Sequence, residues 1–460
     1  MTWEATNLKS RLFGSSGVRG LANLELPPML AAQISLAIAT FSKAKKMLVA
    51  RDTRVSGPML EEALVSGLLA SGATAACIGV VPTPVLAFLT RELHAEAGVM
   101  ITASHNPPQY NGIKIFANDS MAYDEKSQNR IEKMIESQDF IFADWQELSQ
   151  PQYVDESNMY VGMIKKNMAL RKEWHVILDP GCGATYNLAP RVFGDLGCKV
   201  SAINAQADGF FPARSPEPNA ESLKPLAPVV KVIGADVGAA FDGDGDRVAF
   251  IDEKGNLADF DRVLAAYAAH EIRKRGGGVV VTNVEASMCV EKMVEAEGGK
   301  VIRTKVGDVY VSQGVKTHKA AFGGEPCGAW IHAKFHYCPD GILSSVLILK
   351  ALEEEDKTLS EFVSQVPEYP TLRENISCAN EGKHRVVNDA GKRLKTVFPK
   401  YKDFSTTDGV RLAFENGWVL VRASGTEPLV RLTVESKSLK IAKEIMDKSA
   451  RLVRKLVRGD

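Results

Sequence analysis

The sequence predicts an α/β fold in which three related mixed α/β segments are followed by a smaller C-terminal α+β segment. Three observations predict it. Short apolar runs alternate with longer amphipathic stretches, this alternation restarts twice along the chain, and about the last ninety residues carry hairpin signals instead. The chain has 460 residues, which at about 150 residues per domain is enough for three or four domains.

The first α/β segment is predicted to span residues 1–150. Its strands are expected at Lys46–Ala50, Ala75–Val80 and Gly98–Thr102, with a helix at Pro58–Ser71. A polar stretch that contains Pro151 follows at residues 144–153 and indicates a domain boundary.

The second and third segments repeat this alternation without a strict sequence repeat. Residues 151–253 are expected to hold strands at Trp174–Asp179 and Lys199–Ile203 around a helix at Leu188–Leu196. Residues 254–368 are expected to hold strands at Gly278–Thr282 and Lys300–Thr304 around a helix at Ser287–Glu297.

Residues 369–460 are predicted to form the small α+β domain. Three strands are expected, at Asp408–Phe414, Trp418–Arg422 and Leu429–Glu435, with a hairpin turn at Glu415-Asn416-Gly417. An amphipathic helix is expected at Leu439–Val457.

Composition excludes several classes of protein. Lys plus Arg and Asp plus Glu both total 56, so the net charge is +0, without the basic surplus of a nucleic-acid binder. Hydrophobic residues make up 45% and charged residues 24%, which argues against disorder. The N-terminus has no apolar signal region, and the apolar stretch Met29–Phe41 is too short to span a bilayer. The seven cysteines form no CxxC pair, so reduced thiols and a cytoplasmic protein are expected, without nucleic-acid or membrane partners. A homo-oligomer is compatible with the sequence.

The first chemical motif is Thr102-Ala103-Ser104-His105-Asn106-Pro107, directly after an apolar run. A serine at the carboxyl end of a strand faces the crevice where α/β sheets bind ligands, so Ser104 could be a nucleophile or phosphate carrier assisted by His105. The alternative is an Asx-type turn that only caps backbone groups.

The second motif is Asp242-Gly243-Asp244-Gly245-Asp246-Arg247 after a predicted strand. Three carboxylates at every second position can converge on one hard cation, and the glycines let the backbone curl around it. An EF-hand loop is excluded, because its sixth position would be Arg247 instead of glycine. With three protein ligands the ion keeps open positions, as Mg²⁺ does when a phosphate completes its shell.

Two further loops carry polar side chains, one suited to a phosphate and the other to sugar hydroxyls. Arg422-Ala423-Ser424-Gly425-Thr426-Glu427-Pro428, with Arg431 beyond it, offers fork donors, hydroxyls and exposed N–H groups to a phosphate; an ordinary turn with a surface arginine is the alternative. Gly323-Gly324-Glu325-Pro326-Cys327-Gly328, with Arg303 and Lys305 upstream, places one carboxylate where sugar hydroxyls could bind. Arg19 and Lys114 are single cations that could lie near a phosphate.

In this order, these segments resemble the α-D-phosphohexomutase family over essentially the whole chain. The matching segments are FGSSGVRG, TASHNPPQYNGIKIF, DGDGDR, RTKVGDVYV, GGEPCG, RASGTEP and FFPARSPEPNAESL. The resemblance implies a four-domain enzyme around a central cleft that interconverts hexose 6-phosphate and hexose 1-phosphate. It also implies one Mg²⁺ and a hexose 1,6-bisphosphate, which is both intermediate and activator.

The resemblance also implies a role for each motif residue. Ser104 would be the phosphoserine, and its phosphate would complete a magnesium site made by Asp242, Asp244 and Asp246. Glu325, Cys327 and Arg303 would face the sugar. The substrate's other phosphate would be bound by Arg422, Ser424, Gly425, Thr426 and Arg431. Arg19, Arg247 and Lys114 would stabilise the transferring group, with Lys114 a candidate general base if nearby cations favour its neutral form.

The sugar loop departs from the family pattern Glu-x-Ser-Gly-His, because Cys327 replaces the serine and Ala329 the histidine. A proton transfer by that histidine cannot be carried over, and His332 and His336 are expected to be structural. This loop and the glycine in Ser-Gly-Thr-Glu-Pro resemble archaeal glucosamine-directed members, so glucosamine phosphate is the favoured substrate. Mannose or glucose phosphates are the alternative. A non-catalytic sugar-phosphate binding protein is less favoured, because a binder needs no phosphoryl carrier. A phosphate esterase is a further, minor alternative.

Overall fold

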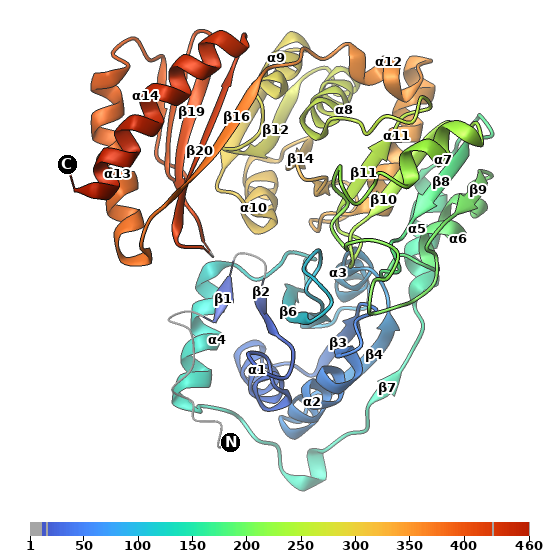
Figure 1. Cartoon of the computed structure of the whole chain (residues 1–460). Helices are drawn as coiled ribbons and strands as arrows, with labels where there is room; N and C mark the ends of the chain where they lie inside the picture. Colours follow the sequence, from blue (N-terminus) through green and yellow to red (C-terminus); the bar gives the residue numbers. More distant parts are fainter. Residues whose placement is uncertain (1–11, 15–16, 426, 460) are drawn as a thin grey trace. The chain divides into compact units, whose positions relative to one another are not determined.

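The computed structural model describes residues 12–14, 17–425 and 427–459. These residues form two compact units (Figure 1). The first lies within Met1–Phe260 and Cys327–Val363, and the second within Asp261–Pro326 and Ser364–Asp460. Residues 254–368 therefore contribute to both units.

The first unit contains a seven-stranded sheet in the order β1-β2-β6-β5-β3-β4-β7. The strands are β1 (Phe13–Gly14), β2 (Gly17–Leu21), β3 (Lys46–Arg51), β4 (Thr74–Val80), β5 (Ala97–Ile101), β6 (Tyr110–Ala117) and β7 (Gln152–Tyr153). The central strands β3 and β5 run parallel, and all five residues of β5 are buried. Such continuous apolar strands are typical of a parallel sheet covered on both faces.

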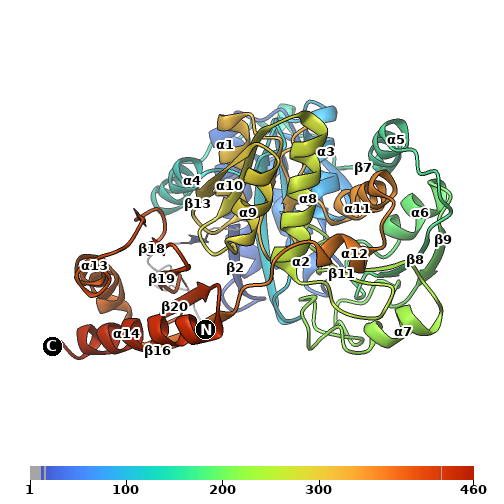
Figure 2. The same ribbon diagram turned by 90° about the horizontal axis from the view of Figure 1, so that it is seen from above.

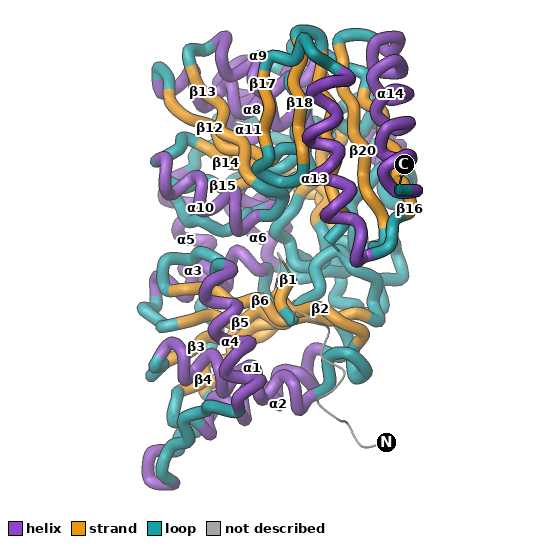
Figure 3. The backbone as a smooth tube through the Cα atoms, turned by 90° about the vertical axis from the view of Figure 1, so that its left-hand side faces the viewer, coloured by secondary structure: helices purple, strands orange, loops and turns teal. Residues whose placement is uncertain are grey.

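Helices cover both faces of this sheet (Figure 3). They are α1 (Pro28–Ser42), α2 (Gly57–Ala70), α3 (Thr83–Glu92) and α4 (Glu125–Ser137). Helices α1, α2 and α4 share one hydrophobic core with the strands. Helix α3 packs on the opposite face, against β3 and β5. The loops after β3 and β5 leave the same edge of the sheet, because neighbouring parallel strands end there. That edge carries Asp52 and Ser104.

A second sheet of the first unit has the order β11-β10-β8-β9. It consists of β8 (His175–Asp179), β9 (Lys199–Ala202), β10 (Val237–Phe241) and β11 (Val248–Ile251). The segment between α4 and β7, which lies beside the first sheet, contains a 3₁₀ turn at Trp145–Glu147. The helices and short elements around the second sheet are α5 (Ser157–Asn167), α6 (Leu188–Asp195), α7 (Leu226–Val232), β15 (Trp330–Ile331), α11 (Gly341–Glu355) and α12 (Leu359–Ser364). Strands β10 and β11 are antiparallel, so the loop between them, Asp242 to Arg247, is a tight turn at the end of a buried strand.

The second unit begins with parallel strands in the order β13-β12-β14. Its elements up to this sheet are α8 (Phe260–Arg275), β12 (Gly278–Asn283), α9 (Cys289–Ala296), β13 (Gly299–Thr304), α10 (Asp308–His318) and β14 (Phe322–Gly324). The carboxyl ends of β12 and β14 carry Asn283 and Glu325, which brings these two residues together.

An antiparallel sheet in the order β16-β20-β19-β18-β17 completes the second unit. The strands are β16 (Thr371–Ser377), β17 (Asp403–Ser405), β18 (Val410–Phe414), β19 (Gly417–Ala423) and β20 (Leu429–Ser436), and the helices are α13 (Asn380–Val397) and α14 (Leu439–Arg458). Both helices pack on one face of the sheet around a shared apolar core (Figures 2 and 3).

The predicted α/β class is confirmed, with three α/β sheets in the first three quarters of the chain and an α+β C-terminus. Each strand and helix expected from the apolar pattern is present within a few residues of its predicted bounds. The elements that were not predicted include strands β6, β16 and β17 and helices α1, α3, α4 and α13. All seven cysteines lie in the described part of the chain and none is in a disulfide. Among the described helices, none combines the length and hydropathy needed to cross a bilayer.

Candidate active site

Ser104 lies on the loop that follows β5 and is buried, with 1% of its surface exposed. Its φ of +53° places it in the left-handed region, which non-glycine residues rarely occupy. The Oγ atom donates a hydrogen bond of 2.7 Å to Asp242 Oδ2 and lies 3.3 Å from His105 Nδ1. The loop thus aims the hydroxyl at the first aspartate of the loop after β10, 138 residues away in the sequence.

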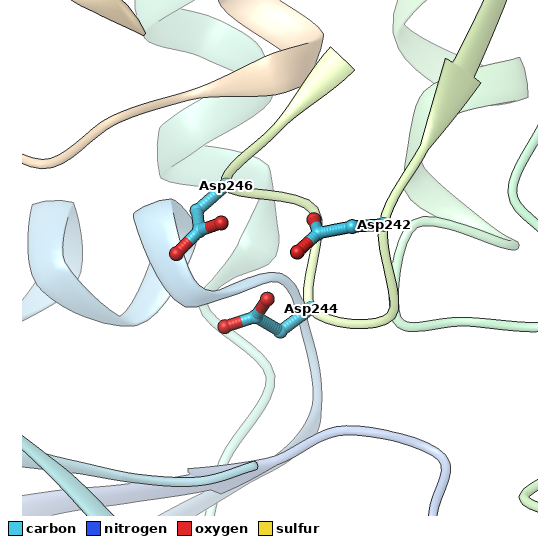
Figure 4. A group of neighbouring side chains, drawn as sticks. All are labelled: Asp242, Asp244 and Asp246. Carbon is cyan, nitrogen blue, oxygen red and sulfur yellow. The ribbon is translucent and has the colours of Figure 1, made fainter. Parts of the chain in front are cut away.

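Asp242, Asp244 and Asp246 converge as the spacing predicts (Figure 4). All three are buried, and one oxygen from each lies within 4.8 Å of the others. Two glycines allow this geometry. A side chain at Gly243 would place its Cβ 2.5 Å from the carbonyl oxygen of Ser104, and Gly245 has a φ of +74°. The two loops can therefore approach each other only because residue 243 has no side chain.

The carboxylates leave oxygen atoms available for a cation. Asp242 Oδ1 accepts hydrogen bonds from the N–H groups of Gly245 (3.0 Å) and Arg247 (3.2 Å). By contrast, Asp244 Oδ1 and Asp246 Oδ1 are buried without a hydrogen-bond partner. Buried carboxylate oxygens without partners destabilise the fold. A divalent cation that prefers oxygen ligands would bind both of these oxygen atoms. The residues present therefore fit the expected Mg²⁺ ion.

Lys114, on β6, supplies the positive charge nearest to this loop. Its Nζ lies 2.8 Å from Asp244 Oδ2 and 2.7 Å from Asp246 Oδ2. Burial, followed by the Asp246 and Asp244 carboxylates, raises the pKa of Asp242 well above its usual range. Burial acts the same way on Asp244, but the Lys114 ammonium and hydrogen bonds from Lys114 and Thr83 hold the pKa of Asp244 below its usual range. Two carboxylates stabilise the charged ammonium, which favours an electrostatic role for Lys114 over proton abstraction.

Arg19, Arg247 and His105 border the same place in the first unit. Arg19 Nη1 donates a 2.6 Å hydrogen bond to Asn106 Oδ1, and Arg247 Nε lies 3.9 Å from Asp246 Oδ1. Burial, then the positive charges of Arg247 and Arg19, lower the pKa of His105 far below its usual range. A neutral imidazole beside Ser104 can hydrogen-bond the hydroxyl, but it is a weak base at neutral pH.

Glu325, in the second unit, directly follows β14 and is 5% exposed. Its Oε1 atom accepts hydrogen bonds from Asn283 Nδ2 (2.6 Å) and from the N–H group of Gly307 (2.8 Å). Gly307 has a φ of +132°, a conformation that favours glycine. The carboxylate is thus fixed by two loops, as a residue that orients a polar ligand needs to be.

Arg303 uses all five of its N–H donors inside the protein. It bonds both carboxylate oxygens of Glu291 (2.6 and 2.7 Å) and the carbonyl oxygens of Asn283, Ala286 and Ser287. The sugar-binding role predicted for Arg303 would require breaking some of these bonds. The geometry favours a role in holding the loop 283–287, which carries the hydrogen-bond partner of Glu325.

Replacing Arg303 by methionine is therefore expected to lower stability. The change removes the partner of Glu291, which is partly buried, and leaves the carbonyl of Ala286 without its donor. The carbonyls of Asn283 and Ser287 each lose one of two donors, and we expect a total cost of about 2–3 kcal/mol. Urea unfolding of the purified variant measures this. Unchanged stability together with a raised KM for sugar phosphate would instead support direct contact between Arg303 and the sugar.

Arg422 and Arg431 lie opposite each other on β19 and β20, so their side chains share one face of the sheet. Arg422 bonds Glu285 at 2.6 Å and Asp408 at 3.4 Å, and Arg431 bonds Glu427 at 2.8 Å. Two like charges in directly paired positions repel each other. A bound phosphate would offset this repulsion.

The loop between these two strands is held by a buried lysine. Lys383 Nζ donates to the carbonyl oxygens of Ser424 (2.6 Å) and Glu427 (3.4 Å), while Ser424 Oγ accepts from the N–H group of Glu427. Gly425 has open space around the position of a Cβ atom. Thr426 lies outside the described residues.

The two histidines near the sugar loop have partners in the first unit. His332 Nε2 lies 2.9 Å from Ser344 Oγ, and His336 Nε2 lies 3.0 Å from Asp340 Oδ2, which also accepts from Tyr160. These buried contacts agree with the structural role expected for both. Cys327 is half-buried in the first unit, next to the Gly328 carbonyl that accepts from the N–H group of Val248.

Several residues that hold the site loops in place were not predicted from the sequence. Asp52 and Arg54 support the Ser104 loop, Asn283 supports Glu325, and Lys383 supports the loop after β19. Asp52 and Asn283 each occur at the end of a predicted strand, the same signal that identified Ser104, and could have been found by it.

The fold and the site define an α/β enzyme with a hydroxyl aimed at a buried carboxylate cluster. Comparison with known proteins identifies its family: four models of phosphoglucomutase/phosphomannomutase, for α/β/α domains I, II and III and the C-terminal domain, match residues 10–142, 152–255, 259–369 and 375–452. The chain belongs to the phosphoglucomutase/phosphomannomutase family of phosphohexomutases.

Relatives and solved structures agree with this assignment. A phosphoglucosamine mutase of Methanocaldococcus jannaschii is 41% identical over 96% of this chain and 98% of its own length. A phosphoglucosamine mutase of Methanococcus vannielii is 40% identical over 96% of this chain and 98% of its own length. The crystal structure of a phosphoglucomutase/phosphomannomutase family protein from Burkholderia thailandensis superposes with a TM-score of 0.88, at 26% identity and 97% coverage of both chains. The crystal structure of an N-acetylphosphoglucosamine mutase of Aspergillus fumigatus shares the fold, with a TM-score of 0.63. It is 15% identical and covers 99% of this chain and 97% of its own.

Proposed function

We propose that the protein interconverts glucosamine 6-phosphate and glucosamine 1-phosphate through a phosphorylated Ser104. The observation that carries this proposal is the 2.7 Å hydrogen bond from Ser104 Oγ to Asp242, which puts a nucleophile-type serine against a buried carboxylate cluster. A protein that only binds sugar phosphates needs neither group.

The proposed reaction has two transfers. In the first, the phosphoryl group leaves Ser104 Oγ as its P–O bond breaks, and a new P–O bond forms at the free hydroxyl of the sugar phosphate. The proton that this hydroxyl loses balances the one that Ser104 Oγ gains as it becomes a hydroxyl again. The resulting hexose 1,6-bisphosphate turns over, and its other phosphoryl group returns to Ser104. A hexose 1,6-bisphosphate supplied from solution would phosphorylate an empty Ser104, which is why we propose it as activator.

The side chains divide this work by charge. Asp242, Asp244, Asp246 and the Ser104 phosphate would hold Mg²⁺, which neutralises charge on the transferring group. Lys114, Arg19 and Arg247 would stabilise the same group by positioning and electrostatics, which supply most of the catalysis in phosphoryl transfer. Glu325 would accept hydrogen bonds from sugar hydroxyls. Arg422, Arg431, Ser424, Gly425 and Thr426 would bind the phosphate that is not being transferred.

Glucosamine is the proposed sugar because relatives about 40% identical over nearly the whole chain are phosphoglucosamine mutases. The Cys327 variant of the sugar loop supports this choice, as does Gly425. The alternative within the same chemistry is a mannose or glucose phosphate. Seven cysteines without a disulfide support the cytoplasm as the place of the reaction.

A coupled assay tests the proposal. The protein, with Mg²⁺ and a catalytic amount of hexose 1,6-bisphosphate, is supplied separately with glucosamine 1-phosphate, mannose 1-phosphate and glucose 1-phosphate. We expect the highest kcat/KM on glucosamine 1-phosphate. Absence of turnover on all three would refute the mutase function, and a higher kcat/KM on mannose or glucose phosphate would reassign the substrate.

Replacing Glu325 by glutamine is expected to raise KM for the sugar phosphate about 10-fold or more, because a charged acceptor for hydroxyl groups is lost. Glutamine Oε1 can still accept from Asn283 and Gly307, so the loop should keep its shape. Steady-state kinetics measure the effect, with Glu444→Gln on the exposed face of α14 as a control. An unchanged KM would remove Glu325 from the sugar site.

A further inference from the structure

Arg54 is a fully buried cation for which the proposed chemistry has no use. It lies on the loop after β3, in the run Arg51-Asp52-Thr53-Arg54, and its side chain has 0% exposure. Its Nε atom donates to Asp52 Oδ2 at 3.0 Å, and this carboxylate is also 0% exposed. Burying two charges costs several kcal/mol per ion, and the cost is recovered only when the remaining donors also find partners. The other N–H groups of Arg54 should therefore have acceptors inside the protein.

The four other N–H donors of Arg54 all reach the Ser104 loop. The Nη2 atom donates to the carbonyl oxygens of Ser104 (2.8 Å) and Asn106 (2.7 Å). The Nη1 atom donates to the carbonyl oxygens of Pro107 (2.7 Å) and Tyr110 (2.9 Å). One guanidinium group thus binds four carbonyls of a seven-residue stretch. Lysine could not do so, because an ammonium group has three donors and no planar fork.

Asp52 holds the same loop from the other side. Its Oδ2 atom accepts a 2.6 Å hydrogen bond from Thr102 Oγ1, and Thr102 Oγ1 in turn accepts from the N–H group of Ser104 at 2.8 Å. Ser104 is therefore bound at its N–H group through Thr102 and Asp52, and at its carbonyl through Arg54. The ring of Phe211 covers the guanidinium, with 5.2 Å between Arg54 Cζ and the ring centroid.

These contacts explain how Ser104 keeps a left-handed backbone. This conformation costs a non-glycine residue roughly 1–2 kcal/mol and persists only where the surroundings fix it. Four carbonyl dipoles that converge on one point also repel each other unless a cation lies between them. Without the guanidinium the loop would relax, and the Oγ atom would no longer point at Asp242.

We propose that Arg54, together with Asp52, is the positioning residue that sets Ser104 for phosphoryl transfer. The inference rests on the proposed mutase function for its effect on rate, but its effect on the loop is independent of that function. A displacement of about 1 Å at a reacting atom can lower a rate about 100-fold, while substrate binding elsewhere is unaffected.

The test compares Arg54→Lys with Arg51→Lys. Arg51 ends β3 and Arg54 follows three residues later, but the side chain of Arg51 pairs with Glu61 on α2 and not with the described part of the Ser104 loop. For Arg54→Lys we expect kcat to fall about 100-fold with KM within threefold of wild type, and amide hydrogen exchange in residues 102–112 to become faster. Arg51→Lys should change neither quantity.

Asp52→Asn is the second variant, since it removes the charge without changing the size of the side chain. It should show the same pairing of lower kcat and faster exchange, even if Arg54→Lys does not fold. Wild-type kcat or wild-type exchange in the folded variants would overturn the proposal, as would a defect in KM alone. If the wild-type protein turns over no sugar phosphate, the mutase function fails, and the exchange data still decide whether Arg54 fixes the loop.

Discussion

Replacing Ser104 by alanine is expected to reduce mutase turnover by at least about 10⁴-fold, the scale seen when a covalent nucleophile is removed from an enzyme. Among the described residues, Ser104 is the one whose hydroxyl bonds Asp242, with 2.7 Å between Ser104 Oγ and Asp242 Oδ2. Without this oxygen the phosphoryl group has no carrier, and the isomerisation cannot start. The remaining side chains can still bind sugar phosphate, so affinity for the substrate should be retained.

The matched control is Ser35→Ala, which removes another buried hydroxyl of the same unit. Ser35 donates to the carbonyl oxygen of Ala32 within α1, far along the chain from the site loops. We expect Ser35→Ala to keep full turnover at a stability cost of about 1 kcal/mol. Mass spectrometry after incubation with a hexose 1,6-bisphosphate should find one phosphate on wild-type Ser104 and none at that position in Ser104→Ala. A folded, active Ser104→Ala variant would contradict the carrier role.

The sequence was sufficient to predict the chemistry of each loop, because chemistry follows from residue type and short spacing. Asp242, Asp244 and Asp246 alternate with glycine, and this local pattern alone implies that the three carboxylates converge. The apolar runs of β5 and β10 are equally local, so the strands that carry Ser104 and Asp242 could be located. The 2.7 Å contact between Ser104 and Asp242 could not be predicted from a local pattern, because the two residues are 138 positions apart. This contact depends on how the two sheets of the first unit pack.

The supporting residues were harder to predict for a physical reason. Arg54, Arg303 and Lys383 act through backbone carbonyls, and every residue type has a carbonyl, so the sequences of their partners carry no signal. Arg303 is an example. Its place upstream of the Gly323–Gly328 loop suggested contact with the sugar, whereas in the structure three of its donors hold residues 283–287 and two bond Glu291. Helix α13 escaped prediction because much of its length is polar and charged.

Replacing Asp242 by asparagine is expected to abolish magnesium binding and to lower kcat about 10³-fold or more, because electrostatic stabilisation of the transferring group is lost. Without metal the same change should leave the protein as stable as wild type or more so, because three buried carboxylates repel each other. Asparagine Oδ1 can still accept from the N–H groups of Gly245 and Arg247, so the turn should survive.

Mg²⁺ at about 100 times its Kd should stabilise the wild-type protein by about 2.7 kcal/mol and leave Asp242→Asn unchanged. Thermal unfolding in EDTA and in a Mg²⁺ series measures both effects. Asp252→Asn is the matched control, because Asp252 is also buried in this unit, but it accepts from the N–H groups of Lys254 and Asn256 outside the cluster. A gain in stability with Mg²⁺ that is equal in wild type and Asp242→Asn would place the cation elsewhere. If Mg²⁺ stabilises the wild type and Asp252→Asn but not Asp242→Asn, the ion binds at the loop that faces Ser104. The bound ion would then explain why three carboxylates are buried on one turn.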